Sequence, residues 1–397
     1  MTDIAPHPDP MAGTRPVRAS AVAVAVTIAC VLPVFLVGGL AVQMREELNF
    51  SPAGLGLVVA VYFGVCALAS VPSGAMVERW GGAVVARAGI LISAACLLAV
   101  AAARSYPVLL GLLAVAGTAN ALGQLSSNVL LARHVPARRQ GLSFGVKQAA
   151  IPVSTLLAGA AVPTLALTVG WRWAFVAAAA AALAVLPVVP AQSPQRARRS
   201  VDSAGRGTFA LVVVGIAAAL AAGGAGTLGT FVVDASVDRG LAPALAGLTL
   251  TLGSAACVVA RVGFGWLADR RSGGHMTVIA GMLVLGAFGL ALLAMTGSAP
   301  LMVGVLLGFG LGWSWPGLMN FAVVQLHPRA PGTATSITQT GVYAGGALGP
   351  LALGSLAAAA GYPTMWLTAA AAMLAAAALM LTATRLLPSR PLNAQRG

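Results

Sequence analysis

GWLADRRSG at residues 265–273 comes at the end of a long apolar run, and a related stretch, GAMVERWGG, comes at the end of another at residues 74–82. A glycine, a carboxylate and an arginine recur in both stretches with one common separation of 191 residues. The aligned pairs are Gly74 with Gly265, Glu78 with Asp269, and Arg79 with Arg270. One separation shared by three residue types indicates an internal repeat.

The composition excludes a water-soluble globular protein. Of the 397 residues, 59% are hydrophobic and 8% are charged, whereas globular domains average about 25% charged residues. The favourable environment for such a chain is lipid. The net charge of +14 does not indicate a nucleic-acid partner, because the basic residues sit in short segments between apolar runs.

Charged and turn residues divide the chain into twelve apolar stretches, each near the ~20 residues that a helix needs to cross about 30 Å of hydrocarbon. Backbone polar groups have no water partners in lipid, so these stretches must be helical. The predicted spans are 19–42, 52–76, 84–103, 107–131, 141–163, 173–190, 208–233, 244–267, 275–296, 300–326, 333–359 and 363–386. We therefore expect an all-α integral membrane fold.

A polar and basic linker at residues 191–207 divides the spans into six plus six. The predicted parts are an N-terminal tail 1–18, a first six-helix bundle 19–190, a second six-helix bundle 208–386 and a C-terminal tail 387–397. Further landmarks relate the two bundles at the same separation. They are Gly141 with Gly332, Gln148 with Gln339 and, within one residue, Asn128 with Asn320. Parallel repeats are related by an axis along the membrane normal.

Lys and Arg residues set the orientation, because they accumulate in cytoplasmic loops. With a cytoplasmic N-terminus, 17 of them fall inside and four outside. The four outside are Arg45, Arg104, Arg172 and Arg239. We therefore predict a multi-pass protein of the cell membrane (plasma or inner membrane) with both termini in the cytoplasm.

The pattern Gly-x-Leu-Ala-Asp-Arg after the second span of a half resembles the signature of the major facilitator superfamily. It is clean at residues 265–270 and degraded in the first half, where Met76 and Glu78 replace Leu and Asp. GWRWAF at 170–175 and the glycine-rich run at 345–350 are also similar to that family. The resemblance covers essentially the whole chain. It implies a bundle of six plus six helices with a central cavity and alternating access, and it identifies no substrate.

The resemblance implies that Glu78 and Asp269 are latches that close the cytoplasmic side in one state. A carboxylate can accept from unpaired N–H groups at a neighbouring helix N-terminus, where the dipole favours negative charge, and a glycine permits close helix contact. The alternative is that these charges only set the topology. The gating motif comprises Gly74, Glu78, Arg79, Gly265, Asp269 and Arg270.

Two basic residues, Lys147 and Arg261, fall within spans, where charges are costly and mark functional candidates. Lys147 shares a polar stripe with Ser143 and Ser154, which is typical of a face toward the bundle interior. The alternative is a lysine that extends to the membrane surface. For Arg261 we also consider such an extension or a structural pair with Asp269.

Polar stripes on other spans support a polar cavity, although a single stripe can equally serve helix–helix hydrogen bonding. The resemblance implies that the first, fourth, seventh and tenth spans line the cavity. The cavity candidates are Lys147, Gln148, Asn120, Gln124, Asn128, Trp313, Asn320, Gln339 and Arg261.

None of the nine carboxylates lies in the middle of a span, whereas the charges inside spans are basic. This distribution favours an anionic substrate, such as a small carboxylate held partly by Lys147, over a cationic drug. We predict no enzyme activity, no cofactor and no metal site, because matches to GxGxxG at 224–229 and GxSxG at 141–145 lie in membrane helices without the strands or partners that those motifs need.

The predicted function is secondary active transport of a small molecule by alternating access, with the lipid bilayer as the surroundings and a monomer as the expected state. A proton is the candidate coupling ion, and uniport is the alternative because no span carries an obvious proton-carrying acid. Two other functions remain open. One is export of hydrophobic compounds or drugs, and the other is a membrane sensor of the same fold that transports nothing.

Overall fold

The computed structural model describes residues 14–50, 52–190 and 206–386. Within these ranges the chain is helical and has no strand. Eleven helices there are long and apolar enough to cross a membrane. The predicted tail 1–18 lies largely outside the described residues, as do the linker 191–207 and the whole of the tail 387–397.

The first group of helices runs to residue 188 and the second begins at residue 206. In the first group are α1 (Thr14–Gly39), α2 (Ala41–Leu48), α3 (Pro52–Trp80), α4 (Gly82–Ala101), α5 (Tyr106–His134), α6 (Ala137–Ala161), a π-helical turn (Val162–Ala166), α7 (Trp171–Val185) and a 3₁₀ turn (Leu186–Val188). In the second are α8 (Arg206–Asp238), α9 (Pro243–Asp269), α10 (His275–Leu292), α11 (Ser298–Leu307), a π-helical turn (Gly308–Gly312), α12 (Trp315–Leu326) and α13 (Pro331–Leu386).

The longest helix, α13, contains two predicted spans. Gly361 interrupts it with φ 82° and ψ 164°, a backbone conformation that favours glycine. Pro363 follows two residues later and begins the next straight segment. With α13 divided at Gly361, the twelve predicted spans all have counterparts in the described structure.

The tenth predicted span is also irregular. It consists of α11, the π-helical turn and α12, and Pro316 lies in the first turn of α12. Proline lacks the N–H that would continue the hydrogen-bond ladder, so the helix is re-started at this point. Trp313 precedes Ser314, the N-cap residue of α12, so its backbone carbonyl lies outside the hydrogen-bond ladder of that helix and can accept hydrogen bonds from a side chain.

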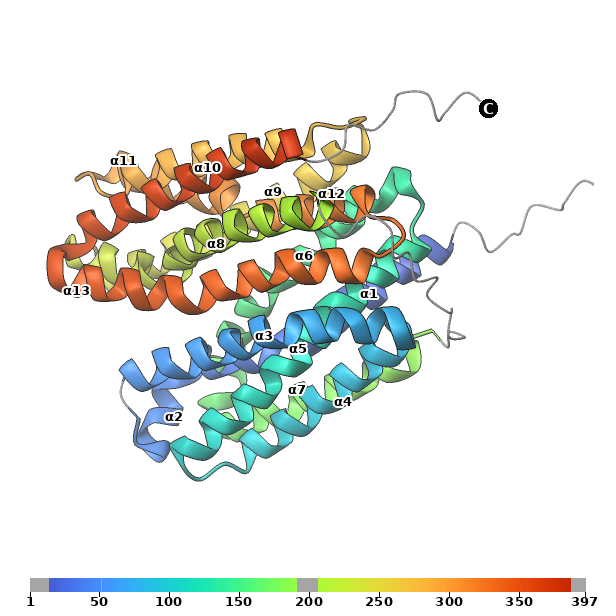
Figure 1. The fold of residues 1–397 in the computed structure, drawn as a ribbon. Coiled ribbons are helices and arrows are strands. Elements are labelled where there is room, and N and C mark those ends of the chain that lie inside the picture. The colour runs from blue at the N-terminus through green and yellow to red at the C-terminus, as the bar shows by residue number, and fades with distance from the viewer. Residues whose placement is uncertain (1–13, 51, 191–205, 387–397) are drawn as a thin grey trace, which may run out of the picture.

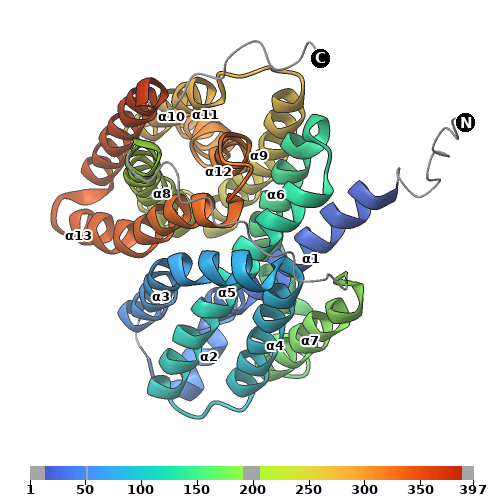
Figure 2. The same ribbon diagram turned by 45° about the vertical axis from the view of Figure 1, so that its right-hand side comes forward.

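The two groups of helices lie side by side and run roughly parallel (Figures 1 and 2). At their interface α3 packs against α13, and α6 packs against α9. The outer surface is apolar, as at Leu68 and Val259, which are 80% and 72% exposed. Large apolar side chains on the outside and small ones between helices are the arrangement expected of a bundle in lipid.

Both groups place related residues at one end of the bundle. Glu78 lies in the last turn of α3 and Asp269 is the last residue of α9, so the motif lies on helix ends rather than in the following loops. We call this end, on the right in Figure 1, the motif end, and the opposite one the far end. The helices α6 and α13 begin at the motif end.

Candidate functional site

Asp269 joins the two groups of helices at the motif end. Its Oδ1 accepts a hydrogen bond from the backbone N–H of Gly141 at 2.6 Å, and its Oδ2 accepts one from that of Leu142 at 2.9 Å. Both donors lie near the N-terminus of α6, where the helix dipole favours a negative charge. Asp269 is therefore held by α6 of the other group and not by Arg261.

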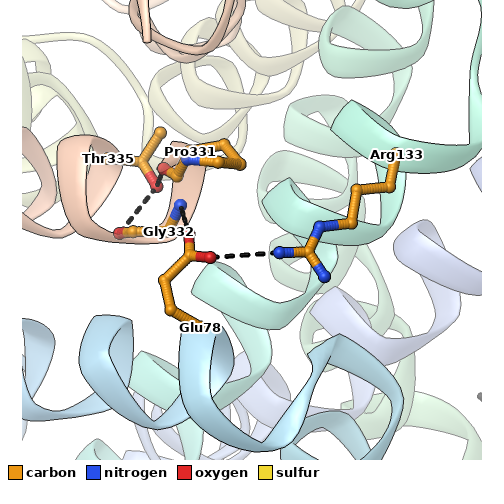
Figure 3. A network of polar contacts seen from close by, with 5 residues as sticks. All are labelled: Glu78, Arg133, Pro331, Gly332 and Thr335. Carbon is orange, nitrogen blue, oxygen red and sulfur yellow. Dashed lines mark hydrogen bonds and ion pairs between the residues drawn. The ribbon is translucent and has the colours of Figure 1, made fainter. Parts of the chain in front are cut away.

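Glu78 makes the equivalent contact in the opposite direction, from the first group to the second (Figure 3). Its Oε1 accepts from the backbone N–H of Gly332 at 2.7 Å, in the first turn of α13. Its Oε2 accepts from Nη2 of Arg133 on α5, at 3.0 Å. We call the Asp269 contact and the Glu78 contact the two clasps.

Glycines allow the helices to approach closely at both clasps. A Cβ atom added to Gly265 would lie 2.6 Å from the carbonyl oxygen of Gly141, and one added to Gly74 would lie 2.7 Å from Cβ of Ser336. Neither separation is tolerated without a shift of the helix. The packing of α9 on α6 and the packing of α3 on α13 therefore each depend on a glycine, which has no side chain, at the contact.

The two motif arginines lie outside the clasps. Arg79 and Arg270 are both exposed, and the guanidinium of Arg270 stacks on the ring of Trp266, 3.5 Å from its centroid. An arginine on an aromatic ring at a helix end is suited to the boundary between lipid and water. Nothing in the described structure ties either arginine to the opposite group of helices.

Lys147 lies inside the first group and is fully buried, so it does not extend to the membrane surface. Its Nζ donates to Oδ1 of Asn128 at 2.9 Å, to Oε1 of Gln124 and, at 3.4 Å, to the carbonyl oxygen of Gln124. The three donors of the ammonium group are thus used. All the acceptors are neutral, so the positive charge has no counter-charge among them.

Arg261 on α9 is also buried, with 2% of its surface exposed. Its Nη1 donates to the carbonyl oxygen of Gln148 on α6, and its Nη2 donates to that of Trp313 at 2.8 Å. The contact with Gln148 crosses between the two groups of helices. Because Gln148 is the neighbour of Lys147, the two buried cations lie in one layer of the bundle, which we call the cationic layer.

The remaining candidates are placed around this layer. Asn120, one turn of α5 from Gln124 toward the far end, donates from Nδ2 to Sγ of Cys66 and to Oη of Tyr343, both at 3.4 Å. Asn320 is fully buried on α12, and Gln339 is buried on α13, one turn before Tyr343. The ring of Trp313 is partly buried, and the Arg261 guanidinium lies 5.9 Å from its centroid.

Comparison with known proteins identifies the fold. The family model of the Major Facilitator Superfamily matches residues 23–214 and again residues 214–396. This chain belongs to the Major Facilitator Superfamily. It is therefore a multi-pass membrane protein with the transporter fold of that superfamily, and each of its two clasps joins one half to the other.

Solved structures of other Major Facilitator Superfamily transporters have the same fold. The human organic anion transporter MFSD10 (TETRAN) matches with a TM-score of 0.76 at 17% identity, over 92% of this chain and 99% of that one. The E. coli fucose:proton symporter FucP matches with 0.71 at 14% identity, over 94% and 100%. The proton:xylose symporter XylE, bound to 6-bromo-6-deoxy-D-glucose, matches with 0.78 at 15% identity, over 93% and 96%.

Two residues of this superfamily member join the site without having been singled out from the sequence. Tyr343 reaches Asn120 from the second half, and its ring stacks on that of Phe63 at 6.2 Å between centroids. Arg133 was counted only as a loop charge, yet it is the side-chain partner of Glu78. A tyrosine in a glycine-rich span was the available signal for Tyr343, whereas nothing local distinguishes Arg133 from Arg138 or Arg139.

Proposed function

We propose that this transporter carries a small organic anion across the cell membrane by alternating access. The observation that carries the proposal is the buried ammonium of Lys147, which is surrounded by neutral acceptors only. A buried charge is costly unless it is paired. A carboxylate that entered this layer would supply the missing counter-charge.

The carboxylates of the chain do not supply that charge within the described residues. Glu78 and Asp269 are engaged in the clasps at the motif end. Asp234 and Asp238 are exposed near the far end of α8, and Glu47 is paired with Arg172. The cationic layer therefore has the electrostatics of a site for an external anion, with Lys147 as the main charge.

Arg261 gives the proposed substrate a way to influence the contact between the halves. Its two hydrogen bonds go to backbone carbonyls, one of them across the interface to Gln148. Hydrogen bonds from a guanidinium to a carboxylate are stronger than those to a neutral carbonyl. An arriving anion would compete for the guanidinium and weaken this cross-link.

The two clasps support the alternating-access part of the proposal. They join the halves at the motif end through hydrogen bonds that a rocking motion would break. We propose that the motif end faces the cytoplasm, as the distribution of Lys and Arg indicates, and that the clasps close that side. The movement is driven by a gradient of the substrate or of a coupled ion.

The structural neighbours give modest support. MFSD10 is named an organic anion transporter, whereas FucP and XylE are named proton symporters of sugars. At 14–17% identity these structures share only the fold with this chain. The argument for an anion therefore rests on Lys147 and Arg261.

Binding and uptake by purified, reconstituted protein test the proposal. A thermal-shift screen should show selective stabilisation by organic anions, and Lys147→Met should remove it and lower uptake of the same anions by at least about tenfold. Arg385→Met, at an exposed arginine near the end of α13, is the charge-matched control and should leave binding and uptake intact. Unchanged anion uptake by Lys147→Met would refute the proposal, and selective stabilisation by lipophilic compounds would favour an exporter of hydrophobic compounds.

A further inference from the structure

We propose that the transported anion is hydroxylated, as a hydroxycarboxylate or a sugar acid is, and that Asn320 and Gln148 recognise its hydroxyl groups. The inference deepens the proposed function and rests on it. Its basis is a set of buried polar atoms that have no hydrogen-bond partner in the described part of the protein. Buried polar groups in native structures are almost always paired, so a concentration of unpaired ones indicates a missing ligand.

Five such atoms lie on four residues in or beside the cationic layer, and others, such as Oδ1 of Asn120 and Nε1 of Trp366, lie elsewhere in the described helices. Among those without a partner in the described structure are Nδ2 of Asn128, Oε1 of Gln148, Nε of Arg261, and both Nδ2 and Oδ1 of Asn320. Their residues are at most 2% exposed. Asn128 already binds Lys147, and the carbonyl of Gln148 binds Arg261, so the unpaired atoms of Asn128, Gln148 and Arg261 belong to the cationic layer.

Asn320 is placed near this layer by the packing of α12 on α6. A Cβ atom on Gly317 would lie 3.2 Å from the carbonyl oxygen of Phe144 and 3.3 Å from Cα of Gly145. Nearer the motif end, Nε2 of Gln325 donates to Oε1 of Gln140 at 2.8 Å. The two helices are therefore antiparallel, and Asn320 lies between these two contacts.

The helical repeat gives the position of Asn320 around α12 relative to Gly317. Three residues beyond Gly317 on a helix of 3.6 residues per turn, it lies on the same side of α12 as Gly317. Gly317 marks the side of α12 that approaches α6, so the fully buried Asn320 lies beside this contact between the halves. It lies about one turn nearer the motif end than Lys147.

The kinds of unpaired atom define the chemistry of the ligand. A carboxylate only accepts hydrogen bonds. It can use the unpaired Nε of Arg261 and Nδ2 of Asn128, and it can take Nζ of Lys147 in place of the 3.4 Å contact of that atom with the carbonyl oxygen of Gln124. Two unpaired acceptors, Oε1 of Gln148 and Oδ1 of Asn320, then still need donors. An ammonium donor is disfavoured beside two cations. Hydroxyl groups are neutral, donate and accept, and so match both the acceptors and Nδ2 of Asn320.

Matched pairs of anions test the inference on the intact reconstituted protein. Glycerate is compared with propionate, and malate with succinate, so that charge and carbon number are equal and only the hydroxyl groups differ. We expect the hydroxylated member to half-saturate the thermal shift at a concentration at least about tenfold lower, because a site built to bind a hydroxyl rejects the analogue that lacks it.

Variants then assign the preference to residues. In Asn320→Leu, the affinity for the hydroxylated anion should fall to that for its deoxy partner, and the affinity for the deoxy partner should be unchanged. Gln148→Met provides a second, independent test should Asn320→Leu fail to fold. Ser236→Ala is the control, since Ser236 is buried on α8 and bonds only within its own helix. The control should keep the full preference.

The outcomes separate the inference from the proposed function. Equal binding of both members of every pair would overturn the inference and leave anion transport standing. Stabilisation by no anion at all would overturn anion transport and the inference with it. A full hydroxyl preference in both Asn320→Leu and Gln148→Met would overturn the assignment, because ordered water would then be the partner of these atoms.

Discussion

Asp269 accepts a hydrogen bond from the backbone N–H of Gly141 at 2.6 Å, although the two residues are 128 positions apart and lie in different halves. The repeat-related residues Glu78 and Gly332, 254 positions apart, make the same contact in the other direction. The halves are thus joined at the motif end by two pseudo-symmetric clasps. In both, the donor is a backbone atom, so the clasps are tested through the carboxylates and the glycines.

Replacing Asp269 by asparagine should open the motif end. An amide retains one acceptor oxygen and loses the charge, so one of two charge-assisted hydrogen bonds is lost, each worth about 1.5–3 kcal/mol. A cysteine introduced at the buried Ser143 should then react with a thiol reagent at least about tenfold faster.

The control for this labelling is Asp238→Asn in the same Ser143→Cys background, because Asp238 is exposed at the end of α8. The four native cysteines are buried and should contribute a low background. If Asp269→Asn left the labelling rate of the introduced cysteine unchanged, a closing role for this clasp would be contradicted.

Gly265→Ala should separate α9 from α6. The added Cβ would lie 2.6 Å from the carbonyl oxygen of Gly141, and overpacking of this kind costs about 1–3 kcal/mol. We expect a lower melting temperature and a transport rate reduced with it. Gly263→Ala is the matched control on the same helix, since its added Cβ meets nothing within 4 Å. Equal melting temperatures for the two variants would refute the close-approach argument.

Lys147 is the single lysine of the chain, so an amine-reactive reagent reports on it directly. In a variant that also carries Arg385→Lys, at an exposed position, labelling of the fully buried Lys147 should be at least about tenfold slower than labelling of the introduced lysine, reflecting the need for local opening. Mass spectrometry separates the two sites. An organic anion that binds should slow labelling of Lys147 further and leave the introduced lysine unaffected. Equal labelling rates at the two lysines would contradict the buried placement.

The ion pair between Glu47 on α2 and Arg172 on α7 should give a small pH-dependent stabilisation. The hydrogen bond from Arg172 lowers the pKa of the Glu47 carboxyl below its ordinary value. A carboxyl with a lowered pKa in the folded state stabilises the protein above the unfolded pKa, and this contribution is lost as the pH falls through the folded pKa.

Both side chains of this pair are partly exposed, at 38% for Arg172 and 48% for Glu47, so solvent screening limits the effect to under about 1 kcal/mol. Glu47→Gln should therefore lower the melting temperature slightly at pH 7, and the difference from the parent protein should vanish once the pH falls below the lowered pKa of the Glu47 carboxyl. Asp238→Asn serves as the control. A difference that grows toward acid pH would contradict the assigned sign.

Much of the fold could be predicted because it depends on local chemistry. Apolar runs long enough to cross lipid have to be helical, and each of the twelve predicted spans has its helix once α13 is divided at Gly361. The prediction placed the charged motif in loops after the spans, whereas Glu78 and Asp269 lie on the helix ends. Helices continue past the apolar run because backbone hydrogen bonding does not require an apolar side chain.

The site was predictable only in part. A lysine and an arginine inside spans marked the cationic layer, but the alternatives for Arg261 were a pair with Asp269 or extension to the surface. Instead it binds the carbonyls of Gln148 and Trp313, 113 and 52 positions away. The carbonyl of Trp313 is available because Trp313 precedes the N-cap residue of α12, and the sequence does not reveal which side chain such a carbonyl will meet.

The sequence by itself determined the number of spans, the repeat at 191 residues and the residue types of both clasps, because hydropathy, helical periodicity and a fixed offset are properties of the chain alone. Only the tertiary structure decided that Tyr343 meets Asn120, that Arg133 completes the Glu78 clasp, and that unpaired amides surround Lys147. These contacts depend on how each helix is rotated and how closely the two halves approach, and packing among many helices sets both.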